Sequence, residues 1–284
     1  MSKPSHTVVA LHRPPWREAL VAAVLLGGSM VVWLLSLGGL SLGWDSLNHH
    51  FYLGLMAVEG ERLERDVFAA GSMSCQYPYA YVPLYWLQSI GATGSQAALV
   101  LALPALAAVP AVWLLSWAIW PVRTCTASLA RVAWVGVAFL SPLWWSLLDS
   151  TSNDLLSTLP MVWAYALIAW RAACDWNGER IDAVHSFSFS FSLAWSTLAG
   201  VLVAIALTIK ISQSFAALGL LMLTLASARG VVIAARRVAA MVLGGALFGL
   251  LVWWPWARDV WRTCGSPIYP MLVDWLRPLA GALP

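Results

Sequence analysis

The chain has 284 residues; 61% of them are hydrophobic, only 10% are charged, and the formal net charge is +3. Soluble domains are typically about 45–50% apolar and about 25% charged, so this composition excludes an ordinary soluble protein. Several apolar runs reach the ~20 residues that a helix needs to cross a bilayer. The sequence therefore predicts an all-α integral membrane protein that forms one domain over 1–284, with the lipid bilayer around it and no nucleic-acid partner.

Seven apolar runs are candidate membrane spans. The first is longer than the roughly 7–15 apolar residues of a secretory signal, so we expect it to remain as an anchored helix. The run 193–228 would be about 54 Å long as a single helix, too long for one crossing. Lys210 at its midpoint predicts a turn at the membrane surface. The expected spans are 19–40, 97–120, 132–148, 155–170, 193–209, 212–228 and 238–256.

Basic residues divide unequally between the two sides of this seven-span topology. With a cytoplasmic N-terminus, the inside holds most of the 16 basic residues and few of the 13 acids. Cytoplasmic loops carry an excess of Lys and Arg, so we expect the N-terminus inside and the C-terminus outside. The basic residues expected inside are Lys3, Arg13, Arg17, Arg123, Arg131, Arg171, Arg180, Arg229, Arg236 and Arg237; those expected outside are Arg62, Arg65, Lys210, Arg258, Arg262 and Arg277.

The first outer loop, 41–93, is long, and the C-terminal segment 257–284 is expected on the same side. Apolar residues at helical spacing over 51–65 predict an amphipathic helix at the membrane interface. The aromatic stretch 77–86 suits the headgroup level. On the other side, the alternating Ser-Phe run 186–192 predicts an irregular lead-in to the fifth span.

Asp45, His49 and His50 follow the first span and bring a carboxylate and two imidazoles to the membrane boundary. In a helical turn, Asp45 and His49 share a face at i and i+4. A carboxylate in this setting can accept a proton from a substrate hydroxyl or ligate a divalent cation. The alternative is structural: Asp45 caps the interfacial helix, and the histidines lie at headgroup level.

Asp149 and Asp154 flank the short second outer loop. Either of them, with His49, is a candidate second acid or metal ligand opposite Asp45. An acid or amide just before a helix is also an ordinary N-cap, which explains at least one of the two.

Lys210, Arg258 and Arg262 are candidate ligands of a phosphate group. A compact ammonium in an apolar run either reaches the surface or meets an anion. Arg258 and Arg262 are spaced i and i+4 and would project together as a phosphate clamp. The alternative for all three is that they extend to the headgroup level without binding a ligand.

Two of the four cysteines, Cys75 and Cys264, are expected outside. A disulfide between them in an oxidising compartment would tie the first outer loop to the last outer segment. Two free thiols are the equal alternative.

The chain resembles the GT-C superfamily of membrane glycosyltransferases, which move sugars from polyprenyl-phosphate carriers. The resemblance covers about 19–272, and the shared module of that superfamily has seven helices and a long first outer loop with an interfacial helix. The stretch Gly265-Ser266-Pro267-Ile268-Tyr269-Pro270 is similar to a Gly-Asn-Pro-x-x-Pro element of bacterial members. The stretches that carry the resemblance are Gly43-Trp44-Asp45-Ser46-Leu47-Asn48-His49-His50-Phe51-Tyr52, Asn153-Asp154, Ile205-Ala206-Leu207-Thr208-Ile209-Lys210, and Trp256-Ala257-Arg258 with Gly265-Ser266-Pro267-Ile268-Tyr269-Pro270.

The resemblance implies that Asp45 acts as a base or metal ligand in an inverting transfer, and that Lys210 and Arg258 hold the carrier phosphate. The first loop has no Asp-x-Asp pair, so the cofactor stays open: a divalent metal is possible but not required by the sequence. The expected function is transfer of a sugar from a polyprenyl-phosphate donor at the outer face of the bacterial inner membrane. A transporter and a non-catalytic protein that binds a lipid-linked sugar are the alternatives. The sugar, the acceptor, the carrier length and the oligomeric state stay open.

Overall fold

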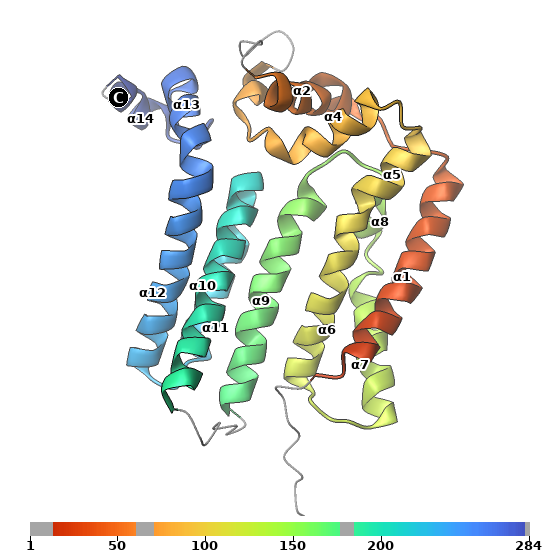
Figure 1. Cartoon of the computed structure of the whole chain (residues 1–284), viewed down its shortest axis with the longest axis vertical. Coiled ribbons are helices and arrows are strands. Elements are labelled where there is room, and N and C mark those ends of the chain that lie inside the picture. Colours follow the sequence, from red (N-terminus) through yellow and green to blue (C-terminus); the bar gives the residue numbers. More distant parts are fainter. Residues whose placement is uncertain (1–13, 61–70, 177–184, 282–284) are drawn as a thin grey trace, which may run out of the picture.

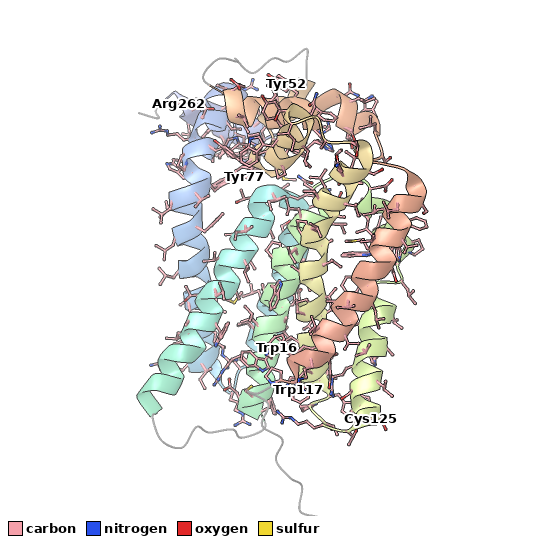
Figure 2. The ribbon with its side chains drawn as sticks, turned by 45° about the vertical axis from the view of Figure 1, so that its right-hand side comes forward. Trp16, Tyr52, Tyr77, Trp117, Cys125 and Arg262 are labelled. Carbon is pink, nitrogen blue, oxygen red and sulfur yellow. A yellow bond between two sulfur atoms is a disulfide. The ribbon has the colours of Figure 1, made fainter. Side chains whose placement is uncertain are left out.

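The computed structural model describes residues 14–60, 71–176 and 185–281, and within these ranges the chain is helical and has no β-strand. Most helices run roughly parallel and form a bundle, while α2 and α4 lie across one end of it (Figure 1). We call this end the capped end. The opposite end, which carries Trp16, Trp117 and Cys125, is called the clasp end (Figure 2).

The first half of the bundle consists of α1 and the helices from α5 to α8. α1 ends at Gly38, whose φ of 78° is a left-handed conformation that L side chains rarely adopt. α5 begins with a capping box in which Thr93 and Gln96 each bind the other's backbone N–H. The helices are α1 (Trp16–Leu37), α5 (Gly94–Ala102), the 3-10 turn η4 (Leu103–Ala107), α6 (Ala108–Ile119), α7 (Cys125–Ala138) and α8 (Pro142–Leu148).

The second half begins with α9 and ends with α14. α10 ends at Ile209, where the extended backbone of Lys210 (φ −151°, ψ 111°) interrupts the helix, which confirms the predicted turn. α10 and α12 pack closely, since a Cβ on Gly200 would lie 1.9 Å from the Met241 carbonyl oxygen. The elements are α9 (Asp154–Trp176), α10 (His185–Ile209), η5 (Ile211–Gln213), α11 (Ser214–Ala226), α12 (Val231–Phe248), the π-turn η6 (Gly249–Trp253), α13 (Trp254–Cys264) and α14 (Val273–Ala280).

The capped end is built mainly from the first loop. α2 is bound closely to the turn before α4, because a Cβ on Gly54 would lie 2.6 Å from the Tyr81 carbonyl oxygen. A helix thus occupies part of the predicted range 51–65, and a π-turn at Ser46 already precedes it, while residues 61–65 lie outside the described residues. Its place at a membrane interface stays a prediction. The elements here are the π-turn η1 (Ser46–His50), α2 (Phe51–Glu59), the 3-10 turns η2 (Gly71–Cys75) and η3 (Tyr79–Tyr81), and α4 (Val82–Ser89).

Four described helical segments are long and apolar enough to cross a membrane, and the pair α7 and α8, bent by 67°, makes a fifth if it counts as one span. Each of the seven predicted ranges overlaps a helix, but the apolar helical segments Leu193–Ile209 and Ile211–Ala226 are shorter than a full span. The apolar helices are those of a membrane-embedded protein; the seven-span count stays a prediction. The expectation of an irregular run at 186–192 is wrong, because α10 already begins at His185. The four segments are Trp16–Leu37, Gly94–Ile119, Asp154–Trp176 and Val231–Cys264.

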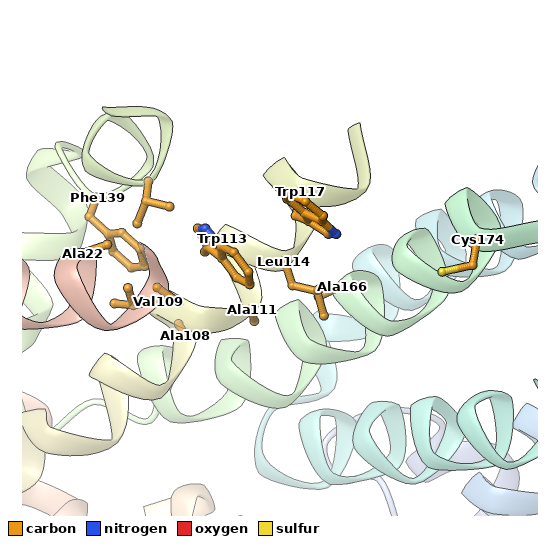
Figure 3. Close-up of a cluster of buried hydrophobic side chains, with 12 residues drawn as sticks. Ala22, Ala108, Val109, Ala111, Trp113, Leu114, Trp117, Phe139, Ala166 and Cys174 are labelled. Atoms are coloured by element: carbon orange, nitrogen blue, oxygen red, sulfur yellow. The ribbon is translucent and has the colours of Figure 1, made fainter. Parts of the chain in front are cut away.

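The core of the first half is a cluster of buried side chains between α1, α6, α7 and α9. Trp113 and Trp117 are fully buried and stack at 6.3 Å, with small residues such as Ala22 and Ala166 around them (Figure 3). Small partners let large indole rings fill the space between helices without voids. The cluster fixes the four helices relative to one another.

A buried ion pair lies beside this core at the clasp end. Arg131 of α7, only 1% exposed, donates from Nε and Nη2 to the two carboxylate oxygens of Glu18 in α1, at 2.7 and 2.6 Å. Its Nη1 donates to the carbonyl oxygens of Trp120 and Val122, and Ser128 also donates to Glu18. We call this cluster the ionic clasp. It satisfies a buried charge pair with several hydrogen bonds, the condition under which burial of ions is tolerated.

Candidate functional site

A cavity of about 640 Å³ lies at the capped end of the bundle. Four segments that are distant in the sequence line it: the first loop from 45 to 81, residues 152–154 where α9 begins, residues 204–212 from the end of α10 into η5, and the stretch 249–270. The lining includes charged and imidazole side chains such as Asp45, His49 and Lys210, and apolar side chains such as Leu207 of α10 and Trp253 of η6. This mixture of an apolar wall and a few polar groups is typical of a small-molecule site.

Asp45 lies at the cavity and precedes the π-turn η1. Its side chain is 64% exposed and makes no capping hydrogen bond. The alternative interpretation, in which Asp45 caps the helix, is therefore wrong. Asp45 Oδ1 is 4.0 Å from Nδ1 of His49, four residues later. The carboxylate therefore lies open to a ligand in the cavity.

His50 is part of a buried hydrogen-bond chain. Its Nδ1 lies 2.6 Å from Oγ1 of Thr151, which lies 2.5 Å from Oγ of Ser46. The imidazole also stacks on Tyr81, with ring centroids 4.5 Å apart. Burial, and secondarily the neighbouring His49, lowers the pKa of His50 to about 4, so that the ring is neutral at pH 7.

His49 is also buried within the protein, at 4% exposed. Burial lowers the pKa of His49, although the nearby Asp45 carboxylate opposes the shift. Its Nδ1 is buried and has no hydrogen-bond partner. The site thus contains two neutral imidazoles, one bound to Thr151 and one with an unused nitrogen.

Lys210 and Asp154 form an ion pair within the cavity lining. The ammonium donates to Oδ1 of Asp154, and the hydroxyl of Ser152 donates to Oδ2. The neighbouring Asn153 donates to the carbonyl oxygen of Ile209, at 3.1 Å, which fixes the loop before α9 to the end of α10. Because the side chains of Lys210 and Asp154 are 35% and 39% exposed, the ammonium remains accessible from the cavity.

An aromatic wall completes the cavity, and sequence reasoning did not identify it as part of a site. The ring centroids of Tyr77 and Trp256 are 5.2 Å apart, and the two rings are nearly perpendicular, with an interplanar angle of 87°. Burial raises the pKa values of Tyr77 and Tyr81, and the charges of Asp45 and Asp154 raise that of Tyr81 further. The aromatic stretch suggested only a preference for the headgroup level; its density in the first loop was the available signal. Thr151 gave no signal beyond the polarity of its loop.

A disulfide joins Cys75 of the first loop to Cys264 at the end of α13. Of the two alternatives that the sequence left open, a disulfide or two free thiols, the structure has the disulfide. Cys75 lines the cavity, and Cys264 is followed by the stretch 267–270, which also lines it. The bond therefore connects two parts of the wall that are 189 residues apart in the sequence.

Three predicted site residues lie outside this cavity lining. Asp149 is half-buried before the α8–α9 loop, and its carbonyl oxygen accepts a hydrogen bond from the Ser41 N–H at 2.8 Å. Arg258 and Arg262 are exposed on α13, and Arg262 lies at the outer surface of the capped end (Figure 2). They share a face of α13, as expected from their spacing, but not the face that borders the cavity.

The cavity does not offer a ready-made metal centre. Among the described residues, no group of three or more His, Cys, Asp or Glu side chains is placed to hold a metal ion. Asp45 and His49 would supply two ligands, while Asp154 is engaged with Lys210 and Ser152. A metal would need further ligands from a substrate, such as phosphate oxygens.

A second groove, of about 900 Å³, runs along α1 and the bend between α7 and α8. Its hydroxyl groups, on Ser29, Ser36 and Ser146, each donate to a carbonyl oxygen within their own helix. The lining contains no charged residue. This groove suits an apolar chain, whereas the smaller cavity is the one lined by charged and imidazole side chains.

In comparisons with known proteins, the chain matches no family model, no curated protein and no solved structure.

Proposed function

We propose that this chain is a membrane glycosyltransferase of the GT-C type, which moves a sugar from a polyprenyl-phosphate donor to an acceptor hydroxyl. The observation that carries the proposal is that Asp45 and Lys210 line one cavity, although they come from distant parts of the sequence. A transfer of this kind needs a base for the acceptor and a cation for the leaving phosphate, and the cavity offers one of each.

Asp45 is the proposed base. The acceptor oxygen forms the new bond to the anomeric carbon while its proton passes to the Asp45 carboxylate. The bond between the anomeric carbon and the phosphate oxygen breaks, and the electron pair leaves with the phosphate. Attack from the side opposite the phosphate inverts the anomeric centre.

Lys210 is the proposed ligand of the leaving phosphate. Its ammonium has three donor hydrogens, and the bond to Asp154 uses one of them. Asp154 therefore holds the ammonium at the cavity and leaves donors for phosphate oxygens. The role proposed for Asp154 is positioning of Lys210, in place of a second acid. Arg258 and Arg262, which lie outside the cavity lining, have no part in this mechanism.

The membrane setting of the proposal uses seven spans, with the N-terminus inside and the capped end outside. The described clasp end holds Arg131, Arg171, Arg229 and Arg237, in keeping with the excess of basic residues on the cytoplasmic side. Ala204 and Leu207 of α10 give the cavity an apolar wall that the isoprenoid tail would follow into the bilayer. The proposed location is the bacterial inner membrane, with the site on the outer face.

The test is turnover by the purified chain in liposomes with a panel of polyprenyl-phosphate hexoses and pentoses. The expected result is release of polyprenyl phosphate by the wild type with at least one donor, and none by Asp45→Asn. Donor binding without release by the wild type would establish the non-catalytic alternative. Counterflow of a labelled solute in the same liposomes would instead establish a transporter.

A further inference from the structure

Two buried nitrogen atoms in the cavity lining have no hydrogen-bond partner: Nδ1 of His49 and Nε1 of Trp256. Buried polar groups in proteins are nearly always hydrogen-bonded, and exceptions call for a specific explanation. The two side chains line the same cavity, although they lie on the first loop and on α13, and each nitrogen is buried at its wall. A ligand that meets both would supply the missing bonds.

The chemistry around His49 favours a hydroxyl group. Its Nδ1 lies 4.0 Å from Asp45 Oδ1, too far for a direct hydrogen bond. A hydroxyl between the two atoms donates to the carboxylate and pairs with the imidazole, because a hydroxyl is both a donor and an acceptor. An anion at this place is disfavoured by the charge of Asp45.

The chemistry around Trp256 favours the same class of ligand. An indole N–H only donates, so its partner must be an acceptor such as a hydroxyl or ring oxygen. Tyr77 meets the ring of Trp256 nearly at a right angle and fixes its orientation. The cavity also contains the indole of Trp253, so that it combines apolar ring faces with a few polar atoms.

We propose that His49 and Trp256 form a subsite for a sugar ring, in which the two nitrogens bind hydroxyl or ring oxygens and the aromatic faces cover the C–H face. This inference rests on the proposed function and extends it, since it assigns the sugar to residues other than Asp45 and Lys210. Within one cavity, Lys210 then meets the phosphate, and His49 and Trp256 meet the sugar.

The test measures binding by the full chain in nanodiscs, with two probes that differ only in the sugar. One probe is farnesyl phosphate, and the other is farnesyl phosphate that carries the hexose or pentose bound most tightly in a panel. His49→Phe keeps an aromatic ring without the nitrogen, and Trp256→Phe keeps an aromatic face without the N–H. Each is expected to weaken binding of the sugar probe about tenfold and to leave binding of farnesyl phosphate unchanged.

Two further variants separate lost contacts from lost structure. His49→Asn places an amide group where Nδ1 lies and is expected to recover part of the affinity that His49→Phe loses. Trp261→Phe is the matched control for Trp256, because Trp261 lies on the same helix, donates to the carbonyl oxygen of Leu276 and lies outside the cavity lining. It is expected to bind both probes as the wild type does.

The outcomes distinguish this inference from the proposed function. If His49→Phe and Trp256→Phe bind both probes as the wild type does, or weaken both equally, the sugar subsite is wrong, while the proposed function stands on Asp45 and Lys210. If farnesyl phosphate does not bind but the free sugar binds and depends on His49 and Trp256, the subsite stands and the polyprenyl-phosphate donor is wrong.

Discussion

The two ends of the bundle each contain an acid–base pair, and the pairs differ in what surrounds them. In the ionic clasp, Arg131 is 1% exposed, and both of its terminal nitrogens and its Nε are hydrogen-bonded. At the capped end, Lys210 and Asp154 are each more than a third exposed and border a cavity. The guanidinium nitrogens of the clasp are hydrogen-bonded to protein atoms, whereas the ion pair at the cavity has donors and acceptors that a ligand can reach.

The difference shows how a structural cluster of charges can be told from a functional one. Burial and full satisfaction make the Glu18–Arg131 pair a device that holds α1 to α7. In the cavity that Lys210 lines, the Asp45 carboxylate is exposed and Nδ1 of His49 has no hydrogen-bond partner, so neither group makes a hydrogen bond that would stabilise the fold. Groups held ready without a protein partner are characteristic of binding and catalytic sites.

The largest expected effect is on stability at the clasp end. Arg131→Met leaves the Glu18 carboxylate buried without its cation, and breaking a buried pair in this way typically costs about 3–5 kcal/mol. We expect the free energy of unfolding in detergent to fall by that amount. Arg258→Met, which removes an exposed guanidinium, is the control and should change it by less than about 0.5 kcal/mol. Equal effects of the two variants would contradict the structural role of the clasp.

A second effect is the pH dependence of the capped end. His50 has a pKa of about 4 in the fold, below its ordinary value of 6.5, so the unfolded chain binds its proton first as the pH falls. The contribution of His50 to stability is therefore complete above pH 6.5 and is lost between pH 6.5 and 4, by up to about 3 kcal/mol. The groups that act on this titration are His49 and Lys210, which lower the pKa, and Asp45 and Asp154, which raise it.

The measurement is the melting temperature between pH 7 and 4 for the wild type and for His50→Gln, whose amide can still pair with Thr151. The wild type should lose stability over this range more steeply than the variant. Parallel curves would show that His50 is not held neutral by its surroundings.

The smallest effect on stability is expected for the outer ion pair. Half-exposed pairs contribute little, so a double-mutant cycle with Lys210→Met and Asp154→Asn should give a coupling energy below about 1 kcal/mol. Donor affinity should respond more strongly: Lys210→Met is expected to weaken binding of farnesyl phosphate about 10–100-fold, as for loss of a charge-assisted hydrogen bond. A coupling energy of about 3–5 kcal/mol, the size of the loss expected for breaking the ionic clasp, together with unchanged donor binding, would show that the Lys210–Asp154 pair is structural as well.

The sequence predicted the parts of this arrangement that depend on apolar run length and on local spacing. The seven apolar ranges all overlap helices, and the break falls at Lys210, where the length of the run required one. The charge division placed Asp45, Asp154 and Lys210 on one side, and the three line one cavity.

The parts that depend on helix rotation and on long-range packing could not be predicted. Spacing put Arg258 and Arg262 on one face of α13, but the rotation of that helix, which decides what the face meets, is set by packing and by the Cys264 disulfide. Burial of His49 and the bond between His50 and Thr151 depend on contacts between the first loop and the loop before α9. Nothing local in either segment indicates this contact.

The central claim is that the carboxylate at the cavity performs the chemistry, and the chain offers a matched pair to test it. Asp45 and Asp149 are both expected on the outer side, but only Asp45 lines the cavity. The measurement is the single-turnover rate of sugar transfer by Asp45→Asn and Asp149→Asn, with donor binding determined in parallel. We expect Asp45→Asn to bind the donor and to transfer the sugar at least about 10³ times more slowly, while Asp149→Asn transfers it at the wild-type rate. Equal rates for the two variants would contradict it.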